Sequence, residues 1–442
     1  MKRRIRIESI ACFVVLIVYI ILVWDRLFQD FWNDEIYTIK HFVLVSFSVT
    51  VNDYHVPNNH VLFSLLLNTY TNLLGIRELK ELIESPFVLR AVPFFISLCT
   101  IVITFRTLKL LCNGYAAVIG TVFLVTTLSF YEFSSQIRGY SLSMCLCSVV
   151  TYLSYKYLTR ANTYTYLLFV ISVCLLGYTI PLNFYYLLSL FLILISRILF
   201  EYLFLHQLPR QSQTSAKRLH LVIGLIFGVL ISLLMYLPII GNVFDNEEVV
   251  SVGVDYVKSL KTYFIVVTSF FSHKLLIVVS SILGIILVLG VTRKKHPRWE
   301  VIWLGVIFSL PFVISALRGD EPAPRVFVNI LPLFSIIIGL LVYRAYQWMN
   351  MQGIVACVLA IYCMGTFYIE KHRYSDLMLD NIKQGQRSQE LNYSYYSYHY
   401  FPLRVLNEFV EKKDDSQLIV MDSEPHGLPN YLEALGIEYQ SI

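Results

Sequence analysis

The chain has 442 residues, of which 57% are hydrophobic and only 15% are charged. A soluble domain of this size rarely carries so few charges, so the composition excludes an ordinary soluble enzyme and favours a membrane protein. The formal net charge is +5, to which residues 371–442 contribute −4, because they hold 7 basic against 11 acidic side chains. The remaining +9 suits anionic lipids or an anionic lipid substrate better than nucleic acid, which we do not expect as a partner.

Apolar runs dominate residues 10–370, and many reach the roughly 20 residues that a helix needs to cross a bilayer. They predict an all-α polytopic membrane protein with about eleven transmembrane helices. The first run follows a basic N-terminus but lacks a small-residue cleavage site, so we expect an uncleaved span. The expected spans are 10–28, 87–110, 115–132, 139–158, 163–180, 183–204, 219–240, 274–291, 300–317, 326–347 and 353–370.

The basic connections predict the orientation of these spans. They all share one side if the N-terminus is cytoplasmic, which is the positive-inside pattern. The same assignment places outside a first loop (29–86), a loop near 241–273 and the tail (371–442). Residues 60–76 are apolar enough for a twelfth span, but a crossing there would invert every later loop, so we predict an interfacial helix. We expect a multi-pass protein of the bacterial inner (plasma) membrane.

Two domains follow from this organisation. Residues 1–370 form the transmembrane domain, and residues 371–442 form a small extracytoplasmic α/β segment. In the tail, the pattern predicts a helix at 403–411, a strand at 417–421 and a helix at 430–435.

An acidic pair follows the first span directly. Asp34 and Glu35 stand among Phe31, Trp32 and Tyr37 at the expected outer membrane interface. A carboxylate in such a place is partly desolvated, which suits it to take a proton from a hydroxyl nucleophile. The alternative is a solvated loop with an aromatic belt.

The same loop carries two histidines and two asparagines before an apolar helix. His55, Asn59 and His60 could bind a sugar or orient a carboxylate, or they could form a turn and helix cap. A divalent cation is compatible with the histidines, but no further Cys, His or carboxylate set has ligand spacing, so no metal or other cofactor is expected. The eight cysteines fall mostly in apolar runs and predict packing residues.

Three arginines lie at expected span ends. An arginine at membrane depth is costly unless it is paired or binds an anion, and a guanidinium matches phosphate oxygens well. Arg138 and Arg325 are therefore candidates for phosphate binding, and Arg90 is a weaker one. Simple snorkelling to the interface is the alternative for each.

Taken in order, these motifs resemble the C-type glycosyltransferases related to protein O-mannosyltransferases and the bacterial lipid A aminoarabinose transferase. Asn58-Asn59 stands where a Pro pair is common, and Val326 stands where a Tyr is common. The matching positions are Asp34-Glu35, residues 58–62, Arg90, Arg138-Gly139-Tyr140-Ser141-Leu142, and Pro324-Arg325-Val326-Phe327 with Leu331-Pro332.

The resemblance implies a membrane enzyme that moves a sugar from a polyprenyl-phosphate donor to an extracytoplasmic lipid, glycan or protein acceptor. It implies Asp34 as general base for an inverting transfer, with Glu35 or His60 orienting Asp34 or binding the sugar. Arg138 and Arg325 would stabilise the leaving phosphate. The resemblance also places Asn59, Arg90 and Tyr140 at the substrate, and His55 is a further candidate substrate-binding residue from its position in the same loop.

Two other classes of protein remain open from the sequence. A lipid or glycan transporter or flippase could use the same intramembrane charges, although we find no internal symmetry of the kind that transporters often show. A polysaccharide polymerase or ligase would also use a polyprenyl-linked donor and outer-loop arginines.

Overall fold

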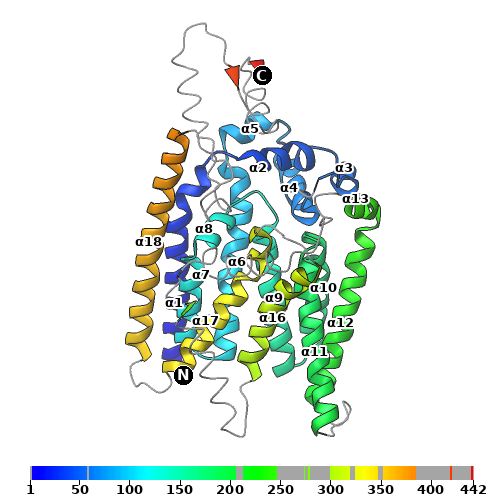
Figure 1. Ribbon diagram of the computed structural model, residues 1–442, viewed down its shortest axis with the longest axis vertical. Helices are drawn as coiled ribbons and strands as arrows, with labels where there is room; N and C mark the ends of the chain where they lie inside the picture. The colour runs from blue at the N-terminus through cyan, green and yellow to red at the C-terminus, as the bar shows by residue number, and fades with distance from the viewer. Residues whose placement is uncertain are drawn as a thin grey trace.

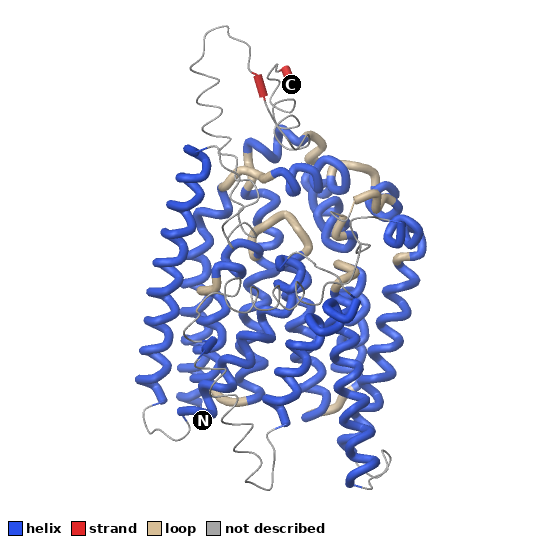
Figure 2. Tube along the Cα trace, in the orientation of Figure 1, coloured by secondary structure: helices blue, strands red, loops and turns tan. Residues whose placement is uncertain are grey.

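The computed structural model is a bundle of long, roughly parallel helices with a layer of short helices at one end (Figure 1). The residues that it describes are 2–56, 59–205, 213–245, 273, 277–278, 299–318, 324–346, 352–384, 419–420 and 440–441. Helices dominate these residues, as Figure 2 shows by colour. The N-terminus lies at the end of the bundle opposite the short helices.

The long helices coincide with the expected spans. Among the described residues, six helices are long and apolar enough to cross a membrane, which confirms a polytopic membrane protein. The expected span 274–291 lies outside the described residues, apart from residues 277 and 278. The helices of the bundle are α1 Lys2–Val23, α6 Phe87–Leu111, α7 Gly114–Val125, α9 Tyr140–Thr159, α10 Thr163–Thr179, α11 Asn183–Leu205, α12 Gln213–Met235, α16 Trp299–Arg318, α17 Leu331–Tyr346 and α18 Gln352–Gln384.

One expected span is broken into two helices. The pattern predicted a single helix over 115–132, but α7 ends at Val125 and a separate helix, α8, runs from Leu128 to Phe133. The hydroxyl groups of Thr126 and Thr127 donate to the carbonyl oxygens of Val122 and Leu124, at 2.7 and 2.8 Å, and such bonds compete with the helical ladder.

The short helices form a layer that we call the cap, residues 33–84. It contains α2 Asn33–Thr38, the π-helix η2 Ile39–Val43, α3 Phe47–Asn52, α4 Val61–Leu74 and α5 Leu79–Glu84. The 14 residues of α4 cover about 21 Å at 1.5 Å per residue, short of the roughly 30 Å of a hydrocarbon core. Gly75, with φ of +75°, ends α4, which stays at the cap end of the bundle. It is a short cap helix, as the interfacial assignment predicted.

Short elements complete the described chain. The 3-10 helix η1 covers Trp24–Phe28, η3 covers Leu237–Ile239, α13 covers Ile240–Asp245 and η5 covers Pro324–Ile330. Helix α18 continues past residue 370, where the sequence suggested a domain boundary, to Gln384. Strand β1, Ile419–Val420, pairs in parallel with β2, Gln440–Ser441, at the cap end (Figure 2). The helices expected at 403–411 and 430–435 lie outside the described residues.

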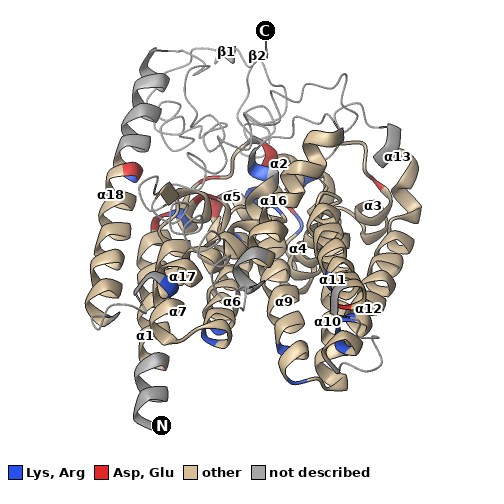
Figure 3. Cartoon of the chain, turned by 60° about the horizontal axis from the view of Figure 1, so that its bottom comes forward, with Lys and Arg blue, Asp and Glu red and all other residues tan. Residues whose placement is uncertain are grey.

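Charge is distributed unevenly along the bundle axis. Figure 3 shows Lys and Arg at the ends of α6, α9 and α12 that lie toward the N-terminus, with an acidic side chain beside them near α12, whereas side chains of both signs occur around α2.

Candidate active site

The Asp34 carboxylate, on α2, forms an ion pair with the Arg138 guanidinium, between α8 and α9. Arg138 is buried, whereas the Asp34 side chain is 22% exposed. The guanidinium carbon of Arg138 lies 5.8 Å from the ring centroid of Trp32 and 5.4 Å from that of Tyr140. The fold therefore brings the expected general base and an expected phosphate-binding group together, and the rings of Trp32 and Tyr140 pack against the guanidinium of the latter.

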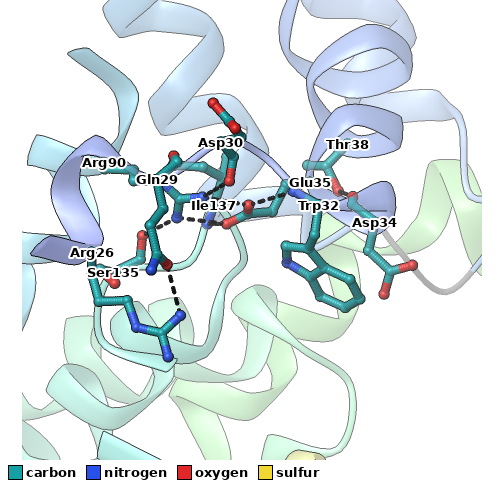
Figure 4. A network of polar contacts seen from close by, with 10 residues as sticks. All are labelled: Arg26, Gln29, Asp30, Trp32, Asp34, Glu35, Thr38, Arg90, Ser135 and Ile137. Atoms are coloured by element: carbon teal, nitrogen blue, oxygen red, sulfur yellow. Dashed lines mark hydrogen bonds and ion pairs between the residues drawn. The ribbon is translucent and has the colours of Figure 1, made fainter. Parts of the chain in front are cut away.

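Glu35 points away from Asp34 and toward Arg90, on α6 (Figure 4). Its two carboxylate oxygens accept hydrogen bonds from Arg90 at 3.0 and 2.8 Å, and both side chains are buried. The same oxygens accept from the backbone N–H groups of Ile137, at 2.7 Å, and Trp32, at 3.1 Å. Glu35 thus holds the turn before α2 against the turn before Arg138.

Arg90 uses every donor of its guanidinium inside the chain. Besides the two bonds to Glu35, it donates to the carbonyl oxygens of Gln29, Asp30 and Ser135 at 2.8–3.0 Å. An arginine has five N–H donors, so all are occupied. A substrate contact from Arg90 would require one of these bonds to break, and the geometry favours a positioning role.

His60 lies at the start of α4 and packs against the turn that carries Arg138. Its Nδ1 accepts a hydrogen bond from the Gly139 N–H at 2.7 Å. Its ring makes a T-shaped contact with the Tyr140 ring, with the two centroids 5.1 Å apart. A Cβ at position 139 would come within 2.8 Å of the His60 Cβ, so this contact needs glycine. Burial, with the positive charges of Arg138 and Arg325, lowers the pKa of His60 well below its ordinary range. The ring is therefore neutral, with its proton on Nε2.

Arg325 lies on η5, which packs against α8 and α9. A chain of buried amides holds this helix in place: Asn329 donates to the Asn183 side chain at 2.8 Å, and Asn183 donates to the Ser143 hydroxyl at 3.0 Å. The positive charge of Arg325 contributes, with that of Arg138, to the lowered pKa of His60.

His55 and Asn59 lie in the loop between α3 and α4. His55 is exposed; its Nδ1 contacts the Asp53 carboxylate at 2.5 Å and its Nε2 contacts the Tyr37 hydroxyl at 2.6 Å. Asn59 is buried and donates to the carbonyl oxygens of Thr50 and Asp53. Asn59 therefore fixes the conformation of the loop, whereas His55 lies on its exposed side. Among the described residues, no group of three or more His, Cys, Asp or Glu could hold a metal ion.

The sequence analysis missed a second buried ion pair beside this site. Arg26, on η1, pairs with Glu132, on α8, and also donates to the Gln29 side chain at 2.7 Å. Gln29 in turn is bound to Arg90 through its carbonyl oxygen. A carboxylate within an expected apolar span was the available signal, because such charges are rare at membrane depth unless paired.

The bundle with a cap over one end is similar in fold to solved C-type glycosyltransferases, as the resemblance predicted. Similar solved structures include ArnT from Cupriavidus metallidurans, at 13% identity and a TM-score of 0.56, over 97% of this chain and 85% of that one. The same enzyme bound to undecaprenyl phosphate gives 11% identity and a TM-score of 0.56, over 98% of this chain and 85% of that one.

An oligosaccharyltransferase from Archaeoglobus fulgidus also has a similar structure, with 10% identity and a TM-score of 0.56. The match covers 96% of this chain but only 61% of the oligosaccharyltransferase. Neither the family models nor the curated sequences that we searched match the chain. At identities of 10–13%, the likeness concerns the fold.

Proposed function

We propose that the protein is a membrane glycosyltransferase that takes a sugar from a polyprenyl-phosphate donor and transfers it to an extracytoplasmic lipid, glycan or protein. The observation that carries this proposal is the Asp34–Arg138 ion pair at the cap end of a C-type glycosyltransferase fold. Structures with this fold include ArnT bound to undecaprenyl phosphate and an archaeal oligosaccharyltransferase in complex with a dolichol-phosphate, which supports a lipid-linked donor here.

In the proposed reaction, Asp34 takes the proton of an acceptor hydroxyl while the hydroxyl oxygen attacks the anomeric carbon of the donor sugar. The new carbon–oxygen bond forms as the bond from that carbon to the phosphate oxygen breaks, with inversion. Polyprenyl phosphate leaves, and Arg138 and Arg325 stabilise the charge that accumulates on it. Arg138 has to exchange Asp34 for the phosphate, and this exchange frees the carboxylate for the acceptor.

The surrounding residues take supporting roles in this proposal. Glu35 and Arg90 fix the segment that carries Asp34. His60 offers a neutral N–H donor beside the turn that carries Arg138, and Tyr140 supports Arg138 and His60 through ring contacts.

The deciding experiment is transfer by the purified protein in lipid nanodiscs. We expect radiolabelled polyprenyl-phosphate sugars, offered with lipid, glycan and peptide acceptors, to yield a labelled acceptor together with free polyprenyl phosphate. A transporter or flippase would release neither product, and a polymerase or ligase would extend or transfer a glycan chain. Absence of both products with every donor and acceptor would overturn the proposal.

The proposed topology has the N-terminus in the cytoplasm, and the cap and the tail outside. We expect Asn52→Cys, exposed on α3, to react with a membrane-impermeant maleimide in intact cells that carry an otherwise cysteine-free protein. The matched variant Arg160→Cys, exposed between α9 and α10, should react only after permeabilisation. The reverse labelling pattern would show that the site faces the cytoplasm.

Arg138 and Arg325 should act together on the donor phosphate. Replacing either with Ala should weaken donor use by about 2–5 kcal/mol, the scale for truncating one partner of a buried charge pair. Lys should rescue only in part, because it lacks the planar fork. Donor kcat/KM would be measured for both single variants, the double variant and Arg77→Ala, an exposed arginine of the cap. If the two arginines bind one anion together, the free-energy loss of the double variant should be smaller than the sum of the losses of the two single variants. Additive losses would assign the arginines to separate tasks.

A further inference from the structure

Trp32 immediately precedes α2, and hydrogen bonds hold its backbone in place. Its backbone N–H donates to the Glu35 carboxylate at 3.1 Å, and its carbonyl oxygen accepts from the N–H groups of Glu35 and Ile36 at 2.9 and 3.0 Å. Because Arg90 fixes Glu35 in turn, the position of Trp32 depends on the same buried pair.

The Trp32 side chain lies within the candidate active site. Figure 4 shows the indole on the same side of the segment as the Asp34 carboxylate, while Glu35 points to Arg90. The Arg138 guanidinium lies over the same ring, with its carbon 5.8 Å from the centroid. One aromatic side chain thus adjoins both the expected base and an expected phosphate-binding group.

The indole Nε1 is a buried donor without a hydrogen-bond partner among the described residues. The residue as a whole is 8% exposed. Leaving a buried N–H unpaired costs free energy, so such a group in a site calls for an explanation, and a bound ligand is one.

We propose that the Trp32 indole N–H donates a hydrogen bond to a phosphate oxygen of the lipid-linked donor, beside Arg138. This inference rests on the proposed function and extends it to a residue that contacts the substrate. Phosphate is favoured over a sugar hydroxyl because the indole can only donate, the phosphate oxygens mainly accept, and Arg138 lies over the same ring. The indole N–H is also uncharged. It can therefore hold the phosphate without forming an ion pair with Asp34.

The test removes the N–H and keeps the ring. Replacing Trp32 with 3-benzothienylalanine substitutes sulfur for the indole N–H in a bicyclic side chain of nearly the same shape. We expect the affinity for undecaprenyl phosphate, measured in nanodiscs, to fall by about tenfold to a hundredfold, the loss expected for one hydrogen bond to a charged group. Trp32→Phe, a second variant without the N–H, should lose at least as much. The melting temperature of the benzothienyl variant should not change.

The matched control is the same replacement at Trp24, which lies on η1 and is 55% exposed. It should leave the affinity unchanged. Undecaprenol, which lacks the phosphate, should bind the wild type and the benzothienyl variant at position 32 equally.

Two further outcomes separate this inference from the proposed function. If the wild type binds undecaprenyl phosphate and the benzothienyl variant binds it equally, the role of Trp32 is overturned and the proposed function stands. If the wild type neither binds this lipid nor transfers any sugar, both are overturned.

Discussion

Replacing Asp34 with Asn should lower turnover by about 10²- to 10⁴-fold, the usual cost of losing a general base. The amide keeps the shape of the side chain but cannot accept the proton of the acceptor hydroxyl. Initial rates at saturating donor would measure this loss on the purified protein. Glu84→Gln, an exposed carboxylate on α5, makes the same change of charge and should leave the rate unchanged. A rate for Asp34→Asn within a few-fold of the wild type would show that another group is the base.

The ion pair between Asp34 and Arg138 adds a second expectation for the same variant. The donor phosphate has to compete with the carboxylate for Arg138, and an amide competes less because it carries no charge. The affinity of Asp34→Asn for undecaprenyl phosphate should therefore equal or exceed that of the wild type. A marked loss of affinity would mean that Asp34 contacts the donor, so the variant distinguishes a base from a binding group.

Two neighbouring carboxylates have different surroundings in this site. Glu35 is fully buried and its oxygens accept bonds from Arg90 and two backbone N–H groups, whereas Asp34 is partly exposed. A short helix puts successive side chains about 100° apart, so adjacent residues face different environments. This division explains how one segment can be anchored through Glu35 and still present Asp34 to a substrate.

The helices were predictable from the sequence because apolar length and basic loops are local properties. The α4 helix is an example, since its 14 residues are too few to cross a bilayer and the charges of the later loops oppose a crossing. The break at Thr126 was not predictable from average hydropathy. It depends on hydroxyl groups that bond to the preceding turn and on the contact between His273 and the Thr126 carbonyl oxygen, at 2.9 Å.

The site was predictable as a set of residues but not as a set of pairs. Asp34, Glu35, Arg90 and Arg138 were each singled out by charge at an expected membrane interface. Which arginine pairs with which carboxylate depends on how α6 and α9 pack, and the sequence does not encode that contact locally. Trp32 was noted only as part of an aromatic setting, because an unpartnered indole N–H is visible only in three dimensions.

The second large effect concerns Arg90, which should act on the structure of the site. Replacing it with Ala removes the ion-pair partner of the buried Glu35 carboxylate and a hydrogen-bond donor from three carbonyl oxygens. Removing one member of a buried ion pair typically costs about 3–5 kcal/mol, so the free energy of unfolding should fall by that amount. Arg90→Lys should recover only part of it, because three donors replace five.

The measurement that decides the role of Arg90 compares folding with donor binding. A positioning role predicts a lower melting temperature and a lower turnover number for Arg90→Ala, because the segment that carries Asp34 is no longer fixed. It also predicts that a fraction kept folded by cooling binds undecaprenyl phosphate nearly as tightly as the wild type. Arg77→Ala, an exposed arginine of the cap, should change neither quantity. If donor affinity instead falls by orders of magnitude while the melting temperature stays constant, Arg90 binds the donor directly, as the resemblance implied, and its bonds to Glu35 must open when the donor arrives.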